Sequence, residues 1–305
     1  MAQRSTVTVT WAGIEGAQPL EVAYLEDGPA DGPLALCLHG FPDHAPTWNA
    51  LLGDLAAEGF HAVAPWLRGY APTAVPADGR FQPAALALDA LALADALAPA
   101  DQPAVLIGHD WGGVAAYPAV VHRPERFTRL VVMAVPHRAA LAARLLTNPS
   151  QLKRSWYMFF FQLPLAAMAV SFNDFAIIDR LWRDWSPGFE PPPEFVRGLK
   201  ETLASEGSLD AAIGYYRHTL NPTLQDPRLA EVEAAANGWV PVPTLYLHGA
   251  DDGCIGAELV VADELKPLFP GGLDLEILDG VGHFLHLEDP TRVNRRIIDF
   301  LTANG

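Results

Sequence analysis

The sequence is poor in cysteine and in positive charge. Cys37 and Cys254 are the only cysteines among 305 residues, which is too few for a disulfide framework and favours a reduced, cytoplasmic protein. Lysine and arginine number 20 against 36 acidic residues, so the formal net charge is −16. Because nucleic acids and anionic membrane surfaces attract basic proteins, this balance argues against both as partners.

Other absences narrow the class further. The first residues lack the apolar core of a signal peptide. There is no GxxxxGK loop for phosphates, and the histidines are scattered along the chain, so we expect neither a cofactor nor a metal ion. The long apolar run at residues 156–172 contains Gln162 and Pro164. We therefore interpret it as a pocket-lining segment and not as a membrane span.

Strand and helix patterns alternate through much of the chain. Ala/Leu-rich and amphipathic stretches predict helices at residues 48–59, 83–97 and 291–303. The predicted strands are residues 6–11, 21–25, 34–38, 61–64, 104–107, 130–134, 244–248 and 273–278. This order predicts an α/β fold with a mostly parallel central sheet and helices on both faces.

One segment without strand patterns interrupts this alternation. From about residue 138 to residue 228 the chain is rich in aromatic residues and proline and holds no strong strand pattern. We predict that residues 138–228 are a helical insertion, and that residues 1–137 and 229–305 form the two parts of one core.

The most informative motif is GHDWGG at residues 108–113, between the apolar run 104–107 and a helical pattern. This context is typical of a nucleophile elbow, whose small residues permit a sharp turn that exposes the central side chain. The central residue here is Asp110. A carboxylate is already ionised at neutral pH and is suited to displacement at a saturated carbon, which leaves an ester for water to cleave. The motif therefore predicts chemistry on epoxides or alkyl halides.

A nucleophile elbow requires an acid and a histidine later in the chain. The turns GADDG at residues 249–253 and GVGHF at residues 280–284 each follow a predicted strand. Since catalytic groups in open α/β sheets gather at the carboxyl ends of strands, we predict His283 as the base. Asp252 is the predicted orienting acid, with its neighbour Asp251 as the alternative.

A further turn follows the predicted strand at residues 34–38, with the motif HGFPD at residues 39–43. Its glycine allows the backbone N–H of Phe41 to point into the site. We predict that this N–H and the backbone N–H of Trp111 form an oxyanion hole.

In this order, these motifs resemble the α/β-hydrolase fold and, within it, the epoxide hydrolase branch. The resemblance covers nearly the whole chain and implies that residues 138–228 are the family's helical cap. It places the acid three residues after the first glycine of its turn, which favours Asp252 over Asp251. It also implies two cap tyrosines that hold the epoxide oxygen. These are Tyr157, shortly before the segment FQLP, and Tyr216, in a Tyr-Arg pair.

The implied substrate is a small apolar epoxide, which water converts to a vicinal diol. Opening an epoxide leaves a strongly basic alkoxide, and a phenol with a pKa near about 10 can donate a proton to it. The resemblance also implies a cis peptide bond between Phe41 and Pro42. A homodimer is compatible with the sequence but not required by it.

Two other classes stay open. Haloalkane dehalogenases resemble this chain in having an aspartate nucleophile followed by a tryptophan whose N–H binds halide, and Trp111 fits that role. They need a second donor, which Phe41 lacks in its side chain, but which the insertion offers in Trp156, Trp182 and Trp185. The other class is a non-catalytic, ligand-binding protein of the same fold. The presence of nucleophile, acid and base together argues against it.

Overall fold

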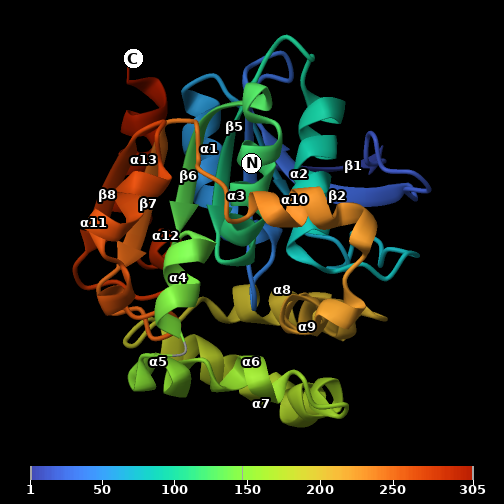
Figure 1. Ribbon diagram of the computed structural model, residues 1–305, viewed down its shortest axis with the longest axis vertical. Helices are drawn as coiled ribbons and strands as arrows, with labels where there is room; N and C mark the ends of the chain where they lie inside the picture. Colours follow the sequence, from blue (N-terminus) through green and yellow to red (C-terminus); the bar gives the residue numbers. More distant parts are fainter. Residues whose placement is uncertain (1, 146, 304–305) are drawn as a thin grey trace.

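The structure is a computed structural model that describes residues 2–145 and 147–303. An eight-stranded sheet runs through it, in the order β1-β2-β4-β3-β5-β6-β7-β8 (Figure 1). The strands are β1 Gln3–Val9, β2 Leu20–Asp27, β3 Leu34–Leu38, β4 His61–Pro65, β5 Ala104–His109, β6 Phe127–Met133, β7 Thr244–Gly249 and β8 Leu273–Leu278. The pairs β1–β2 and β2–β4 are antiparallel, and β4, β3, β5, β6, β7 and β8 are parallel, which confirms the predicted mostly parallel sheet.

The central strands are buried on both faces. Every residue of β3, β4, β5 and β7 is buried, as expected for continuous apolar runs in a parallel sheet covered by helices. The core helices are α1 Asn49–Ala57, α2 Pro83–Leu97, α3 Trp111–His122, α10 Ala230–Ala235, α11 Ala262–Leu265, α12 Leu285–Glu288 and α13 Pro290–Thr302. Helices α2, α3 and α10 pack together on one face, whereas α1 packs against α13 on the other (Figure 1).

Sequence spacing explains how α13 covers its face of the sheet. Val293, Ile297 and Leu301 are buried, and they recur every four residues along the helix. This spacing places the three side chains on one stripe that faces the core. Short 3-10 helices lie in the core at Ala45–Trp48, Pro124–Arg126, Ala257–Leu259 and Lys266–Leu268, and at the end of the segment 138–228 at Pro222–Leu224 and Pro227–Leu229.

The cap segment, residues 138–228, lies beyond the carboxyl ends of the parallel strands (Figure 1). Its α-helices are α4 Arg138–Leu145, α5 Pro149–Arg154, α6 Trp156–Phe160, α7 Ala166–Trp185, α8 Pro193–Ala204 and α9 Ser208–Leu220. Helix α7 is kinked at residues 172–175. The apolar run 156–172 is thus divided between α6 and the first part of α7. Within the described parts of the chain, no helix combines the length and apolar character needed to cross a membrane.

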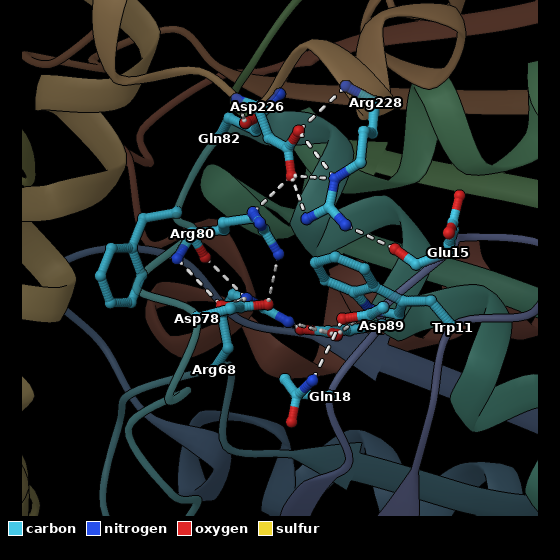
Figure 2. A network of polar contacts seen from close by, with 12 residues as sticks. Trp11, Glu15, Gln18, Arg68, Asp78, Arg80, Gln82, Asp89, Asp226 and Arg228 are labelled. Carbon is cyan, nitrogen blue, oxygen red and sulfur yellow. Dashed lines mark hydrogen bonds and ion pairs between the residues drawn. The ribbon is translucent and has the colours of Figure 1, made fainter.

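A polar network ties the end of the cap segment to the core (Figure 2). The buried Arg68 donates to Asp89 on α2 at 2.6 and 2.8 Å, and the indole of Trp11 donates to the same carboxylate at 2.7 Å. Asp78 lies 3.5 Å from Arg68 and 3.4 Å from Arg80.

The network continues to the point where the chain returns to the core. Asp226 pairs with Arg80 at 2.5 Å and with Arg228 at 2.8 Å, and its backbone N–H donates to Gln82 at 2.6 Å. One connected set of hydrogen bonds and ion pairs therefore holds together the N-terminal segment, α2 and the end of the cap segment (Figure 2).

Candidate active site

A sharp turn joins β5 to α3 and presents Asp110. Asp110 has φ of 50° and ψ of −116°, a conformation that is strained for a residue other than glycine. Glycines make the turn possible. A Cβ atom on Gly112 would lie 2.0 Å from the Leu38 carbonyl oxygen, and one on Gly108 would lie 2.5 Å from the carbonyl carbon of Gly112. The GHDWGG motif therefore folds into the tight strand–turn–helix unit that its sequence predicts.

The carboxylate of Asp110 contacts the turn after β3. The Phe41 N–H donates to Asp110 Oδ1 at 2.7 Å, and the Trp111 N–H also bonds this carboxylate. A Cβ atom on Gly40 would lie only 2.3 Å from the same Oδ1, so a glycine is needed for this close approach. The Phe41–Pro42 bond is cis, as the resemblance implied. The two predicted oxyanion-hole donors thus both bond the carboxylate of Asp110.

Asp252, and not Asp251, contacts His283. His283 Nδ1 lies 2.9 Å from Asp252 Oδ2, whereas Asp251 is exposed. The other oxygen of Asp252 accepts from the N–H groups of Cys254 and Ile255, at 2.7 and 2.9 Å. Both oxygens of this buried carboxylate therefore have partners, and its orientation toward His283 is fixed.

His283 lies between the two carboxylates. Its Nε2 atom is 3.8 Å from Asp110 Oδ2. Burial opposes a charge on the imidazole, but the neighbouring Asp252 outweighs it, so the pKa of His283 lies above its ordinary value. Burial raises the pKa of Asp110 in turn, and His283 and the N–H groups of Phe41 and Trp111 only partly counter the rise. The arrangement can remove a proton from a molecule held between His283 and Asp110.

The two predicted cap tyrosines lie together above Asp110. The ring centroids of Tyr157 and Tyr216 are 5.6 Å apart, with the planes nearly perpendicular. Burial raises the pKa of both phenols well above the usual 10.0, helped by Cys254 beside Tyr157 and by Asp110 beside Tyr216. Both are therefore protonated at neutral pH and can serve as donors.

The neighbour of Tyr216 has a different partner. Tyr215 donates its hydroxyl to the Arg68 carbonyl at 2.7 Å, toward the polar network and away from Asp110. On the same helix, one position separates a tyrosine that faces the site from one that supports the core.

A largely apolar cavity of about 270 Å³ lies between the core and the cap segment. Four of the predicted site residues line it, namely Asp110, Trp111, Tyr157 and Tyr216. Apolar side chains from α3, α4, α6 and α9 form most of the remaining wall, including Val114, Leu141, Leu145, Met158 and Leu220. A nucleophile and two phenols thus face one space that suits an apolar molecule.

The tryptophans of the cap segment do not face this space. Among the described residues that line the cavity, the only tryptophan is Trp111. The indole of Trp182 donates to the Pro42 carbonyl at 2.9 Å, and Trp185 packs edge-on against His283 with 5.1 Å between ring centroids. Trp182 and Trp185 therefore contact the turn after β3 and His283, and they do not line the cavity.

Comparison with known proteins identifies the family. Residues 35–296 match the model of the alpha/beta hydrolase family. Epoxide hydrolase 3 of Xenopus tropicalis is 31% identical over 285 residues, covering 91% of this chain and 74% of that protein. Human epoxide hydrolase 4 is 30% identical, covering 92% and 76%. The chain belongs to the α/β-hydrolase family, in its epoxide hydrolase-like branch.

Solved structures show the same fold. A putative epoxide hydrolase from Klebsiella pneumoniae superposes with a TM-score of 0.82 at 25% identity, covering 97% of both chains. A Bacillus megaterium epoxide hydrolase, solved with an inhibitor, superposes with a TM-score of 0.80 at 24% identity, covering 96% of this chain and all of that one. The α/β-hydrolase fold therefore extends over the core and the cap segment together.

This α/β-hydrolase also gathers buried polar residues that sequence reasoning missed. Asp43, His109 and His286 bring potential ligand atoms within 4.8 Å of one another beside the predicted triad, a grouping that could hold a metal ion. Burial lowers the pKa of His286 to about 3 and raises that of Asp43 to about 8. Each residue lies within three positions of Phe41, Asp110 or His283, and this proximity is the signal that could have identified the group.

A second missed group involves Cys254. Its sulfur, Asp252 and His283 also lie within 4.8 Å of one another, but the Asp252–His283 hydrogen bond already engages that pair. Cys254 is buried, and its sulfur lies 3.3 Å from the Tyr157 hydroxyl. No sequence motif marked this cysteine, because its partner is almost one hundred residues away along the chain.

Proposed function

We propose that this protein hydrolyses small apolar epoxides to vicinal diols through an ester on Asp110. One observation carries the proposal. Asp110, Tyr157 and Tyr216 all line the same apolar cavity, so that a nucleophile and two proton donors face one bound molecule. The similarity to proteins named epoxide hydrolases, over nine-tenths of the chain, supports the same substrate class.

In the first half-reaction, Asp110 attacks an epoxide carbon. Oδ1 accepts from the Phe41 N–H, and Oδ2 is the oxygen that we assign to the new C–O bond. The carbon–oxygen bond of the ring breaks, and its electron pair becomes an alkoxide. Tyr157 or Tyr216 transfers its proton to that alkoxide, which leaves a hydroxyalkyl ester on Asp110 and a phenolate.

In the second half-reaction, water cleaves the ester. His283, oriented by Asp252, takes a proton from the water as its oxygen attacks the ester carbonyl carbon. The N–H groups of Phe41 and Trp111 stabilise the resulting oxyanion. Collapse of this intermediate breaks the ester C–O bond, and the second proton of the water passes to the departing alkoxide, which releases the diol and regenerates the Asp110 carboxylate. The proton held by His283 returns to the phenolate, which restores the free enzyme.

Dehalogenation is the second candidate, and the position of Trp111 on the cavity wall favours it. Its indole could bind a halide ion next to Asp110. The tryptophans of the cap segment do not supply the second halide donor that such an enzyme needs. Trp182 already donates to Pro42, and neither Trp156 nor Trp185 is among the described cavity residues. The two phenols beside Asp110 have a use with an epoxide that a haloalkane does not require, since halide leaves without a proton.

The first experiment uses His283→Gln, which blocks ester hydrolysis and spares ester formation. Intact mass is recorded after mixing with styrene oxide and, separately, with a 1-haloalkane. We expect a mass gain equal to the whole epoxide, located on the peptide that holds Asp110. Asp110→Ala in the same background is the control and should gain nothing.

Three other results of the mass measurement are possible, and each supports a different conclusion. A gain equal to the alkyl group alone, seen only with the haloalkane, would establish a dehalogenase instead. A gain that persists in the Asp110→Ala control would place the reactive group elsewhere. No adduct from either compound, with an ordered cavity that still binds both, would favour the non-catalytic class.

A further inference from the structure

Cys254 contacts three parts of the active site at once. Its backbone N–H donates to Asp252 at 2.7 Å, and its carbonyl accepts from the side chain of Gln151 on α5 at 2.8 Å. Its sulfur lies 3.3 Å from the Tyr157 hydroxyl. The first two contacts are made by the backbone, so of these three contacts a substitution at this position removes only the one with Tyr157.

The two cap tyrosines differ in their polar contacts. The Tyr157 hydroxyl has the sulfur of Cys254 as its hydrogen-bond partner, whereas the buried Tyr216 hydroxyl has, among the described residues, only the side chain of Trp111 as a polar neighbour. Aromatic neighbours surround both rings, with Phe161 near each and Trp185 4.9 Å from Tyr157 between centroids. Ring packing fixes the plane of a phenol but leaves its O–H bond free to rotate. The sulfur is thus the group that can set the direction of the Tyr157 O–H.

The sulfur remains a thiol in this setting. Cys254 is almost wholly buried, and burial raises its pKa well above the ordinary value, with Asp252 and Asp110 adding to the rise. A thiol can both accept and donate a weak hydrogen bond. It can therefore accept from the phenol in the free enzyme, and donate to the phenol oxygen once the phenol proton points at an epoxide.

We propose that Cys254 is a positioning residue for Tyr157. With an epoxide bound, its S–H donates to the Tyr157 oxygen, which directs the phenol proton at the epoxide oxygen and stabilises the phenolate that forms. The inference rests on the proposed function. It assigns Cys254 to ester formation and not to ester hydrolysis, because the contacts that orient Asp252 come from the backbone of residue 254 and from Ile255.

The test compares Cys254→Ala and Cys254→Ser in the His283→Gln background, where the rate of ester accumulation with styrene oxide reports ester formation alone. We expect Cys254→Ala to slow accumulation about threefold to tenfold, the range for one lost hydrogen bond. Cys254→Ser, which restores a donor, should stay within about twofold of the parent. Cys37→Ser is the matched control, since Cys37 is the other buried free thiol and lies within β3, and it should match the parent.

Two further measurements keep the test specific. In the Tyr157→Phe, His283→Gln background, Cys254→Ala should cause no additional slowing, because the coupled partner is gone. With His283 restored, single-turnover experiments should show an unchanged rate of ester hydrolysis. Melting temperatures of all variants confirm that each is folded.

A failure of the inference about Cys254 can be distinguished from a failure of the proposed function. If His283→Gln alone forms no ester, the proposed function fails. If the ester forms and Cys254→Ala accumulates it at the parental rate, the inference about Cys254 fails alone. Equal slowing by the alanine and serine variants, or slowing that persists without the Tyr157 hydroxyl, would reduce Cys254 to a packing residue.

Discussion

The core and the cap segment hold their halves of the site by different means. In the core, backbone N–H groups fix the carboxylates of Asp110 and Asp252, and glycines allow contacts that no larger residue would permit. In the cap segment, ring-on-ring packing holds Tyr157 and Tyr216, with one sulfur contact as the polar supplement.

The two kinds of contact restrict different degrees of freedom of the side chains. Hydrogen bonds from the backbone fix the position of an atom, whereas packing of rings fixes planes and distances and leaves hydroxyl rotation open. The core half therefore holds a nucleophile and a base in one arrangement. Under the proposed function, the cap half leaves the O–H direction of its two donors to be set by the bound epoxide.

The largest expected effect comes from removing both donors of the cap half. In the His283→Gln background, Tyr157→Phe with Tyr216→Phe should slow ester formation by about 10²–10⁴-fold, the usual contribution of a general acid. Each single variant should lose much less, because the other phenol still serves. The measurement is the time course of the mass gain with styrene oxide. Ester formation at the parental rate in the double variant would mean that the cap half supplies no proton.

A smaller effect, on stability alone, tests whether the polar network belongs to the core scaffold. Asp89→Ala leaves the buried Arg68 without its closest carboxylate and should lower the free energy of unfolding by about 3 kcal/mol. Arg180→Ala, which breaks the exposed pair with Asp184, should change it by less than about 0.5 kcal/mol. Urea unfolding provides both values. Below the transition, Asp89→Ala should form and hydrolyse the ester normally; loss of chemistry in the folded variant would tie this network to the site.

The smallest expected effect is a shift in pH dependence within the core half. Ester hydrolysis needs neutral His283, and the neighbouring Asp252 raises the pKa of this imidazole, so the rate should fall at low pH as His283 becomes protonated. Asp252→Asn removes the main cause of the rise and should move this acid limb to lower pH while lowering the plateau. Single-turnover rates of ester hydrolysis against pH provide the comparison. An acid limb that stays in place in Asp252→Asn would contradict the assigned role of the carboxylate.

The sequence predicted the core well because local patterns determine it. The predicted strands 34–38 and 273–278 coincide with β3 and β8, since each is a short apolar or alternating run with clear boundaries. The motifs around Asp110 and His283 predicted where these side chains would lie, because strand ends in a parallel sheet meet at one edge.

Features that depend on distant parts of the chain were less predictable. The choice between Asp251 and Asp252 needed the burial of one and the exposure of the other. The contact of Cys254 with Tyr157 and the kink in α7 arise only when the cap segment packs on the core. Composition and periodicity carry no signal for such contacts, whereas the family resemblance supplied the tyrosines.

The scarcity of cysteine has a chemical consequence for an enzyme that acts on electrophiles. Epoxides alkylate thiolates, and a protein that meets them at each turnover is exposed to damage by its own substrate. Here both thiols are buried, and burial raises the pKa of Cys37 and of Cys254. The thiolate is the reactive form, so burial that disfavours it makes both cysteines poor targets for an epoxide. The same burial that shapes the interior thus guards the two thiols against alkylation.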